Sequence, residues 1–368
     1  MQKNCLRYPV EFVRDVFGES DTLAETLRKV SGSESPRVLI VADLNVVQRV
    51  ESLGAQIGRY VQAHDIRLAG SPVVMASGEK IKADNFMSAL HVMSAVLDAK
   101  LGKNDIVLAL GGGTLLDVAG YAAAQVRGGV KLVRMPTTPV AMIGACHADY
   151  AAIDSSNVKD ALRVPSVPSA VVIDVGFAQS VLDGVWRSGL GEAFRLAVSS
   201  DSALMKKIVK LAPAYCGRDP AALTEIAEGV AKMVAKKGVS RFGCWSAARL
   251  ESMSCYKLPY GYAVSMGTLV DVRYSKEKGV LNDKDFGFLV DFMTKNGLLD
   301  GLPHSQHLFA QSDVVLFGLD AWQLATGSPT IELVAGVGKS ATEESPDRAV
   351  FKKVMKDILS PVSSPAER

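Results

Sequence analysis

The rest of this chain is organised around the stretch Ile106–Ala124, IVLALGGGTLLDVAGYAAA. Its opening residues are apolar and rich in branched side chains, which predicts a buried strand. Gly111, Gly112 and Gly113 follow, and an apolar-periodic helix is expected to begin at Thr114. Glycine lets the backbone turn sharply, and the unpaired N–H groups at the helix start suit a phosphate or pyrophosphate. A tight turn without a ligand remains the alternative, because the spacing is not the G-x-G-x-x-G of a Rossmann turn.

Length and composition are those of a globular protein with two domains. The chain has 368 residues, of which 48% are hydrophobic and 22% charged, and its formal net charge is +2. This charge gives no global field that would indicate a nucleic-acid or membrane partner. The 5 cysteines lack CxxC spacing, which argues against a disulfide framework and against a zinc ribbon. No apolar run of about 18 residues is present, so we expect a cytoplasmic protein.

Strands and helices alternate through the first half of the sequence. Besides the strand before the glycines, strands are predicted at residues 8–13, 37–42, 71–76, 131–134 and 170–174. Helices are predicted at residues 22–30, 46–62 and 85–101, the last with Phe86, Leu90, Met93 and Val96 on one face. This alternation predicts a parallel sheet wrapped by helices, where ligands gather at the carboxyl ends of the strands. Asp43, Glu79 and the glycine turn all follow predicted strands.

The pattern changes after the strand at 131–134. Residues 136–154 form a long, weakly periodic segment, and the chain becomes largely helical beyond Gly176. Helices are predicted at residues 177–182, 185–197, 202–211, 220–237, 245–254, 263–278 and 284–296. The last residues, 359–368, read as a frayed tail. We therefore predict an α/β domain over residues 1–175 and a helical domain over residues 176–368.

Five short motifs stand in the order typical of one enzyme family. The pattern GGGxxxDxxGxxA is matched by Gly111–Gly113, Asp117, Gly120 and Ala123. The shorter motif DxNV is matched by Asp43, Asn45 and Val46, and GExxK is matched by Gly78, Glu79 and Lys82. PTT is matched by Pro136, Thr137 and Thr138, and SGLAEvxK is matched by Ser188, Glu192 and Arg195. On these motifs the chain resembles dehydroquinate synthase and the related sugar phosphate cyclases. The resemblance implies a Rossmann-like NAD-binding α/β domain followed by a helical domain, and a homodimer.

The resemblance also implies NAD as the cofactor. Asp43 and Asn45 would hold the adenosine ribose, and Glu79 and Lys82 would contact the dinucleotide. The three glycines would carry the pyrophosphate, while Asp117, Thr137 and Thr138 would line the nicotinamide side. Carboxylates that bind ribose hydroxyls, and bare N–H groups that bind phosphate, supply the chemistry that these roles need. The alternative for each residue is a helix cap or a solvated charge.

At the metal site the sequence departs from the family. Family members bind a divalent metal through one glutamate and two histidines, and the glutamate is matched by Glu192. The histidine positions are taken by Cys244 and Tyr260. A thiolate can replace an imidazole in a zinc site, but a tyrosine must first lose a proton of pKa near ~10. We therefore expect no metal here, with a Glu–Cys–Tyr zinc site as the alternative. Among the 5 histidines, His147 is the candidate for acid–base work or ligation, unless it is a loop histidine bonded to backbone.

The cationic groups that hold the substrate in the family are fewer in this sequence. Tyr150 stands at a lysine position, Gly144 at an aspartate position and Asp160 at an asparagine position. Fewer charge-assisted bonds imply a different or less anionic substrate, or none. The residues that remain as catalytic candidates are Lys159, Glu192, Arg195, Lys232, Tyr150 and Tyr260.

The family reaction begins with transient oxidation of a secondary alcohol by NAD⁺, continues through phosphate elimination and re-reduction, and ends in ring closure. Our first hypothesis is a divergent, metal-independent, NAD-dependent lyase of this type that acts on a sugar phosphate or polyol. Lys232, Arg195 or Tyr260 would stabilise an oxyanion in place of the metal. Tyr150, Tyr260 or His147 would transfer protons. The alternatives are an NAD(H)-binding pseudoenzyme or regulatory partner without turnover, and an NAD-dependent polyol dehydrogenase.

Overall fold

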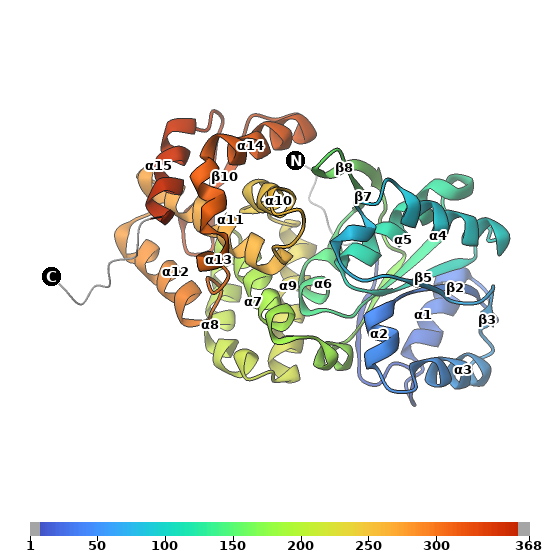
Figure 1. Ribbon diagram of the computed structural model, residues 1–368. Helices are drawn as coiled ribbons and strands as arrows, with labels where there is room; N and C mark the ends of the chain where they lie inside the picture. The colour runs from blue at the N-terminus through green and yellow to red at the C-terminus, as the bar shows by residue number, and fades with distance from the viewer. Residues whose placement is uncertain (1–7, 360–368) are drawn as a thin grey trace. The chain divides into compact units, whose positions relative to one another are not determined.

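A computed structural model describes residues 8–359 of the chain (Figure 1). Its contacts group the chain into two compact units. The first unit holds the chain through Gly189 together with Gly217–Val239, and the second holds Leu190–Cys216 and the chain from Ser240 onward. The first unit thus contains residues 176–189 and Gly217–Val239 in addition to the predicted α/β segment 1–175. Among residues 8–359, no helix combines the length and the apolar character that crossing a membrane requires.

A parallel sheet is the framework of the first unit. The strands are β1 (Val10–Val13), β2 (Arg37–Asp43), β3 (Arg67–Leu68), β4 (Val73–Met75), β5 (Ile106–Gly111), β6 (Lys131–Pro136) and β9 (Ala170–Asp174). Their order is β1-β9-β6-β5-β2-β3, and β4 also pairs with β2. Figure 1 shows α1 and α3 on one side of this sheet and α4 and α5 on the other. Because both faces are covered, β5 and β9 are buried along their whole length, which explains their unbroken apolar sequences.

The strand order reverses between β2 and β5. After β2 the chain adds β3 and β4 on one side, then crosses to β5 on the other side and continues outward to β6. Ala42 of β2 pairs with Leu110 of β5, so the two strands end at the same level. Open α/β sheets bind ligands at such a reversal, outside the carboxyl ends of the strands.

The helices of the first unit confirm most of the predicted positions. They are α1 (Thr22–Ser31), α2 (Leu44–Arg49), α3 (Leu53–Ala63), α4 (Met87–Asp98), α5 (Gly113–Gln125), α6 (Pro139–Ile143) and α9 (Pro220–Lys237), with 3₁₀ turns η1 (Glu79–Ile81), η2 (Val126–Gly128), η3 (Ala145–His147) and η4 (Val175–Ser180). The single helix predicted over 46–62 was wrong, because Ser52 adopts a left-handed φ of 54° between α2 and α3. The helix predicted over 177–182 is the 3₁₀ turn η4.

The buried face of α4 also differs from the prediction. Ala89, Val92 and Val96 face the core, whereas Leu90 is 50% exposed. Positions spaced by three and four residues from Ala89 define the buried stripe, and Leu90 lies about a third of a turn away from it. The predicted placement of Leu90 on the buried face was therefore wrong.

A hairpin begins at the end of the weakly periodic segment 136–154 and continues beyond it. β7 (Tyr150–Ser155) pairs with β8 (Val158–Pro165) in antiparallel fashion. The connecting residues Ser156 and Asn157 have φ values of 52° and 59°. Two successive residues with positive φ are typical of the type I′ turns that join adjacent strands. The hairpin packs against α5, the helix behind the glycine turn.

The second unit is mostly helical. It holds the later part of α7 (Asp183–Val198) with α8 (Ser202–Cys216), α10 (Cys244–Met253), α11 (Tyr260–Glu277), α12 (Asp283–Lys295), α13 (Leu302–Ser305), the 3₁₀ turn η5 (Gln306–Gln311), α14 (Ser312–Thr326) and α15 (Arg348–Leu359). A hairpin of β10 (Ile331–Gly336) and β11 (Lys339–Glu343) follows α14. α11 contacts α10, α12, α15 and β10, and is buried along most of its length. The predicted tail lies outside the described residues, except for Leu359.

Candidate functional site

The glycine turn leaves the first turn of α5 without a side-chain cap. Gly112 is the N-cap residue, has extended backbone and provides no capping side chain. The first backbone N–H groups of α5 therefore carry partial positive charge without a capping side chain to accept from them. A Cβ at Gly111 would lie 2.7 Å from Cδ2 of Leu115 and 3.1 Å from Cβ of Asp43. The end of β5 thus needs glycine, because the start of α5 and the end of β2 lie so close to it.

Asp43 lies at the end of β2 beside this turn. Its carboxylate caps α2 by accepting the backbone N–H of Asn45 at 2.8 Å, and it accepts the hydroxyl of Ser77. Asp43 is only 8% exposed, whereas Asn45 lies on the surface. The helix-cap role that was the alternative for Asp43 is therefore present in the structure.

The PTT motif lies at the end of the neighbouring strand β6. The N–H of Thr137 donates to the carbonyl of Gly111 at 3.0 Å, and a Cβ at Gly112 would lie 3.4 Å from Cγ2 of Thr138. Thr138 also caps α6 through Ala141. The Thr137 hydroxyl is buried and has no hydrogen-bond partner among the described residues. Buried polar atoms are rarely left unpaired, so this hydroxyl is open to a ligand or a water molecule.

A buried cluster around Lys82 joins η1, α5 and the β7–β8 hairpin. The Lys82 ammonium lies 2.7 Å from Oδ2 of Asp117 and 2.6 Å from Oδ1 of Asp160. Carboxylate oxygens of Glu79 and Asp154 each lie 3.7 Å from the same nitrogen. The Lys82 side chain is 3% exposed, so these contacts are made in a poorly solvated environment. Four carboxylates thus surround one buried ammonium group.

Glu79 connects this cluster to the first turn of α5 and to β8. Its Oε2 accepts the hydroxyl of Thr114 at 2.7 Å, and its Oε1 lies 2.5 Å from the ammonium of Lys159. Burial opposes the charged form of Glu79, but Lys159 and Lys82 outweigh it and lower its pKa to about 2. Lys159, a predicted substrate ligand, therefore already has a carboxylate partner within its own unit.

The carboxylates of the cluster differ in how readily they ionise. Burial raises the pKa of Asp117, which Lys82 only partly offsets. Burial acts in the same direction on Asp160, but Lys82 and Lys159 outweigh it and lower the pKa of that group. Asp160 reaches Lys82 from a backbone with φ of 53°. The cluster has more carboxylates than lysines, so it offers no surplus positive charge to an anionic substrate.

The second unit contains another buried cluster, built on α7 and α11. Arg195 donates from Nε to Oε2 of Glu192 at 2.9 Å and from Nη2 to Oε1 at 2.6 Å. The hydroxyl of Tyr260 donates to the same Oε2 at 3.2 Å. Both charged side chains are 3% exposed. The structure therefore brings together Glu192, Arg195 and Tyr260, three of the predicted catalytic residues.

Cys244 begins α10 beside this cluster, and the chain before it binds the same guanidinium. Arg195 Nη1 donates to the carbonyls of Ser240 at 2.7 Å and of Phe242 at 3.2 Å. Burial disfavours the charged guanidinium, but Cys244 and Glu192 outweigh it and hold the pKa of Arg195 above its ordinary value. Burial raises the pKa of the Cys244 thiol to about 11 and that of Tyr260 above its usual range. The site thus holds a guanidinium cation, a carboxylate, a thiol and a phenol.

These donors do not fit a divalent metal ion. Both oxygens of Glu192 accept hydrogen bonds from Arg195, and the thiol and the phenol beside them hold their protons. Metal ions bind thiolate and carboxylate rather than thiol and phenol. Among residues 8–359, no group of three or more His, Cys, Asp or Glu side chains is arranged to hold a metal.

None of the contacts described above for the two clusters involves the remaining predicted residues Lys232, Tyr150 and His147. Lys232 on α9 is exposed and lies 3.5 Å from Glu228, one helical turn away. Tyr150 begins β7, and the Arg163 guanidinium lies 4.9 Å from its ring centroid. His147 is 3% exposed, and neither ring nitrogen has a hydrogen-bond partner in the described part of the chain. Burial, followed by the nearby Arg134, lowers its pKa to about 4, so this histidine stays neutral at physiological pH.

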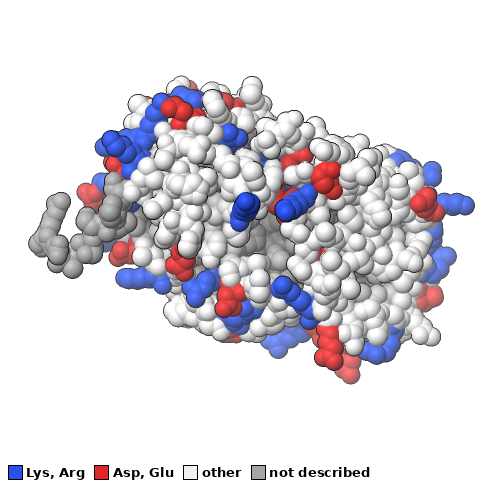
Figure 2. Space-filling model, viewed as in Figure 1, with Lys and Arg blue, Asp and Glu red and all other residues white. Residues whose placement is uncertain are grey.

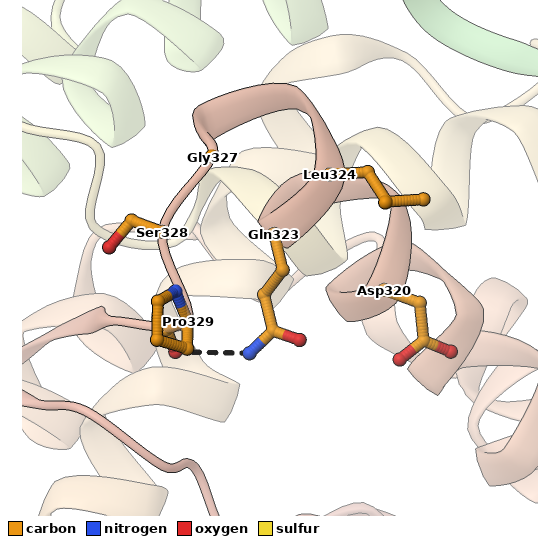
Figure 3. A pocket seen from close by; sticks show the side chains of 6 residues that line it. All are labelled: Asp320, Gln323, Leu324, Gly327, Ser328 and Pro329. Carbon is orange, nitrogen blue, oxygen red and sulfur yellow. Dashed lines mark hydrogen bonds between the residues drawn. The ribbon is translucent and has the colours of Figure 1, made fainter.

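The surface of the described residues carries mixed charge on one face (Figure 2) and a shallow hollow. On the face shown in Figure 2, acidic and basic side chains are interspersed. A shallow hollow at the end of α14 is lined by Asp320, Gln323, Leu324, Gly327, Ser328 and Pro329. Figure 3 shows this hollow, where Gln323 donates to the carbonyl of Pro329 at 3.0 Å. None of the predicted site residues lines it.

Several residues of the two clusters were not predicted. Thr114 lies three positions before Asp117 on the same face of α5, a spacing that could have identified it. Asp154 is a neighbour of Lys82 through the β7–β8 hairpin, which no clear sequence pattern predicts. The carbonyls of Ser240 and Phe242 could not have been found from side-chain motifs, because they belong to the backbone.

Comparisons with known proteins agree with the fold and the motifs. A family model described as 3-dehydroquinate synthase N-terminal matches residues 72–187. A 3-dehydroquinate synthase of Desulforamulus reducens is 28% identical over 289 residues, which cover 74% of this chain and 78% of the relative.

Solved structures show the same fold along nearly the whole chain. A 2-epi-5-epi-valiolone synthase from Streptomyces hygroscopicus subsp. jinggangensis, with NAD⁺ and Zn²⁺ bound, has a TM-score of 0.81 at 22% identity, covering 97% of this chain and 98% of that chain. A 2-deoxy-scyllo-inosose synthase complexed with carbaglucose-6-phosphate, NAD⁺ and Co²⁺ has a TM-score of 0.69 at 16% identity, covering 97% and 99%. The predicted fold class is therefore confirmed. The chain is therefore similar in sequence to the 3-dehydroquinate synthases and shares its fold with the sugar phosphate cyclases.

Proposed function

We propose that this protein is an NAD-dependent enzyme of the sugar phosphate cyclase type that works without a divalent metal at Glu192. The proposed substrate is a sugar phosphate or polyol. The observation that carries the cofactor assignment is the uncapped start of α5 at the reversal of strand order between β2 and β5. The relatives named above support the reaction class.

The residues at the ends of β2, β5 and β6 fit a dinucleotide. The N–H groups at the start of α5 would bind the pyrophosphate, because they combine unpaired donors with the positive end of the helix dipole. Asp43 would accept ribose hydroxyls, and Thr137 would use its unpaired hydroxyl toward the nicotinamide side. When bound, NAD⁺ supplies a hydride acceptor for a secondary alcohol. Glu79 and Lys82 would position the first turn of α5 through Thr114 and Asp117.

At the second cluster, the chain itself supplies the positive charge. Arg195 is held by Glu192 and by two backbone carbonyls, so its guanidinium has a fixed orientation. A preorganised donor of this kind can stabilise an oxyanion without reorganising. Tyr260 keeps its proton at the hydroxyl oxygen and hydrogen-bonds Glu192, which makes it a proton donor of fixed position.

Binding of NAD⁺ tests the cofactor assignment directly. Titration calorimetry with NAD⁺ should show binding, and saturating NAD⁺ should raise the thermal unfolding midpoint by several degrees. Gly112→Ala should lose at least about tenfold in affinity while the protein stays folded, because its φ of −72° accepts alanine and the methyl group would stand at the phosphate-binding N–H groups. Gly54→Ala is the matched control, since a Cβ at Gly54 meets nothing within 4 Å. Absence of NAD⁺ binding to the unmodified protein would refute the assignment.

Release of inorganic phosphate tests the reaction class. The NAD-loaded protein should release phosphate from at least one member of a panel of sugar phosphates, in the presence of a chelator. If Lys232 contacts the substrate, Lys232→Ala should lower this rate about tenfold or more without changing NAD⁺ affinity. Lys236→Ala, at another exposed lysine of α9, is the control.

A second function is favoured by the charge balance of the Lys82 cluster. Lys159 pairs with Glu79 and Lys82 lies among four carboxylates, which reduces the positive charge available to a phosphorylated substrate. This arrangement suits an NAD(H)-binding protein without turnover. Tight NAD⁺ binding with no phosphate release and no NADH formation from any sugar phosphate or polyol of the panel would favour that function over the enzyme.

A further inference from the structure

We propose that Arg195 is a built-in cation that excludes divalent metal from Glu192. The predicted reason for metal loss was the absence of the two histidines. The geometry adds a second reason, which acts even when histidines are present. The inference extends the metal independence proposed above, but it concerns metal binding alone and does not depend on turnover.

The carboxylate of Glu192 is already occupied on both oxygens. Arg195 reaches Oε2 through Nε at 2.9 Å and Oε1 through Nη2 at 2.6 Å, which is the paired geometry in which a guanidinium binds a carboxylate most strongly. The hydroxyl of Tyr260 takes a further position on Oε2. A metal ion approaching Glu192 would compete with Arg195 for the carboxylate oxygens and would meet a like charge within a few ångströms.

The guanidinium is also fixed from its other side. Arg195 Nη1 donates to the carbonyls of Ser240 and Phe242, in the segment that leads to Cys244. Four oxygen atoms from two segments therefore converge on one buried cation, as oxygen ligands would on a metal ion. Moving the guanidinium away would leave buried Glu192 without its counter-ion, which is strongly unfavourable.

A lysine at this position could not hold the site in the same way. Arginine offers five donors in a rigid planar fork, and four of them are used here. Lysine offers three donors on one nitrogen at the end of a flexible chain, so it cannot span the carboxylate and both carbonyls at once. The identity of residue 195 is therefore expected to decide whether Glu192 is available as a metal ligand.

The test restores the histidines with and without Arg195. The double variant Cys244→His, Tyr260→His keeps Arg195, and the triple variant adds Arg195→Lys. Zinc affinity is measured by competition with a chromophoric chelator, and zinc content by mass spectrometry after dialysis. We expect the triple variant to bind about one Zn²⁺ per chain, at least about 100-fold more tightly than the double variant. Arg195→Lys alone, which lacks the histidines, is the control and should bind zinc no better than the unmodified protein.

Equal zinc affinity in the double and triple variants would overturn the proposal, as would a folded triple variant that binds no zinc. Circular dichroism and thermal unfolding establish that each variant is folded. If the triple variant does not fold, a cycle of Arg195→Met and Glu192→Gln in the unmodified chain gives the answer. Each single change should lower the unfolding midpoint more than the double change does, because each leaves one buried partner uncompensated. Additive effects would contradict the proposed role of Arg195 as the counter-charge of Glu192.

Discussion

Two buried cations, Lys82 and Arg195, organise the two clusters and differ in their surroundings. Lys82 lies among carboxylates that outnumber the nearby lysines, whereas Arg195 faces one carboxylate and two neutral carbonyls. Protonation of a carboxylate therefore changes the charge balance of the Lys82 cluster in acid. The Arg195 cluster contains a single ion pair, between Arg195 and Glu192.

Glu79 should make the stability of the protein depend on pH in the acid range. Its pKa falls from 4.5 in the unfolded chain to about 2 in the folded one, so its stabilising effect is complete above about pH 4.5 and is lost as the pH falls toward 2. At pH 7, Glu79→Gln should lower the free energy of unfolding by about 2–4 kcal/mol, because Lys159 loses its buried partner. Denaturant titrations should show this difference shrinking steadily below pH 4.5.

Glu228→Gln provides the control for this change. Glu228 pairs with Lys232 in an exposed position, so the substitution should alter the free energy of unfolding by no more than about 0.5 kcal/mol, both at neutral pH and in acid. A Glu79→Gln deficit that stays constant from pH 7 to pH 3 would show that the ion pair is not its cause.

Individual site residues could be predicted where the chemistry follows directly from a strand end. The glycine turn and Asp43 lie at the carboxyl ends of β5 and β2, as the strand pattern indicated, and Thr137, which only the family resemblance suggested, lies at the end of β6. The partners of these residues were harder to predict. Lys82 meets Asp160 and Asp154 only because a hairpin folds back over α5, and no spacing in the sequence reveals such a contact.

The close packing of α11 on the start of α10 requires glycine at position 267. A Cβ at Gly267 would lie 2.2 Å from the carbonyl oxygen of Gly243 and 3.0 Å from the N atom of Ala247. Gly267→Ala should therefore force the helices apart and lower the free energy of unfolding by about 1–3 kcal/mol. Thermal or denaturant unfolding measures the effect.

Gly287→Ala in α12 is the matched comparison. A Cβ at Gly287 meets nothing within 4 Å, and this residue lies inside a helix. Alanine should therefore stabilise the protein by about 0.5–1 kcal/mol, since it reduces the freedom of the unfolded chain. A Gly267→Ala protein as stable as the Gly287→Ala protein would contradict the close packing of α10 on α11.

Elements with strong end signals could be predicted to the residue, and elements without them could not. α9 spans Pro220–Lys237 as predicted, because Asp219 caps its start, proline occupies its first position and Gly238 ends it. The β7–β8 hairpin was missed because its turn, Ser156–Asn157, contains no glycine and most of β8 is not buried. Hydrophobic alternation is weak in such a strand, so periodicity does not indicate it.

The division of the chain into two units predicts which fragments fold on their own. α9 packs against α6 and η4 of the first unit, although residues of the second unit precede and follow it in sequence. A fragment of residues 1–175 should therefore lack a cooperative thermal transition, because the apolar surface that α9 covers would be exposed. A fragment that joins residues 1–189 to residues 217–239 through a short glycine-serine linker should melt cooperatively. Near-ultraviolet circular dichroism distinguishes the two, and a cooperative 1–175 fragment would support the simpler boundary instead.

Because segments of the two units alternate along the sequence, neither unit can be completed early during synthesis on the ribosome. Synthesis delivers residues through Gly189, then Leu190–Cys216, and only afterwards α9, which belongs with the earlier part. The sheet can form early, yet its unit stays incomplete until Val239 has left the exit tunnel. The segment Leu190–Cys216 is also made early, and helix spacing already brings Arg195 and Glu192 together within it. Its apolar surface stays exposed until the segment from Ser240 onward has been made. The nascent chain therefore carries two unfinished apolar surfaces at once over this interval, which is when a holding chaperone would have its greatest effect.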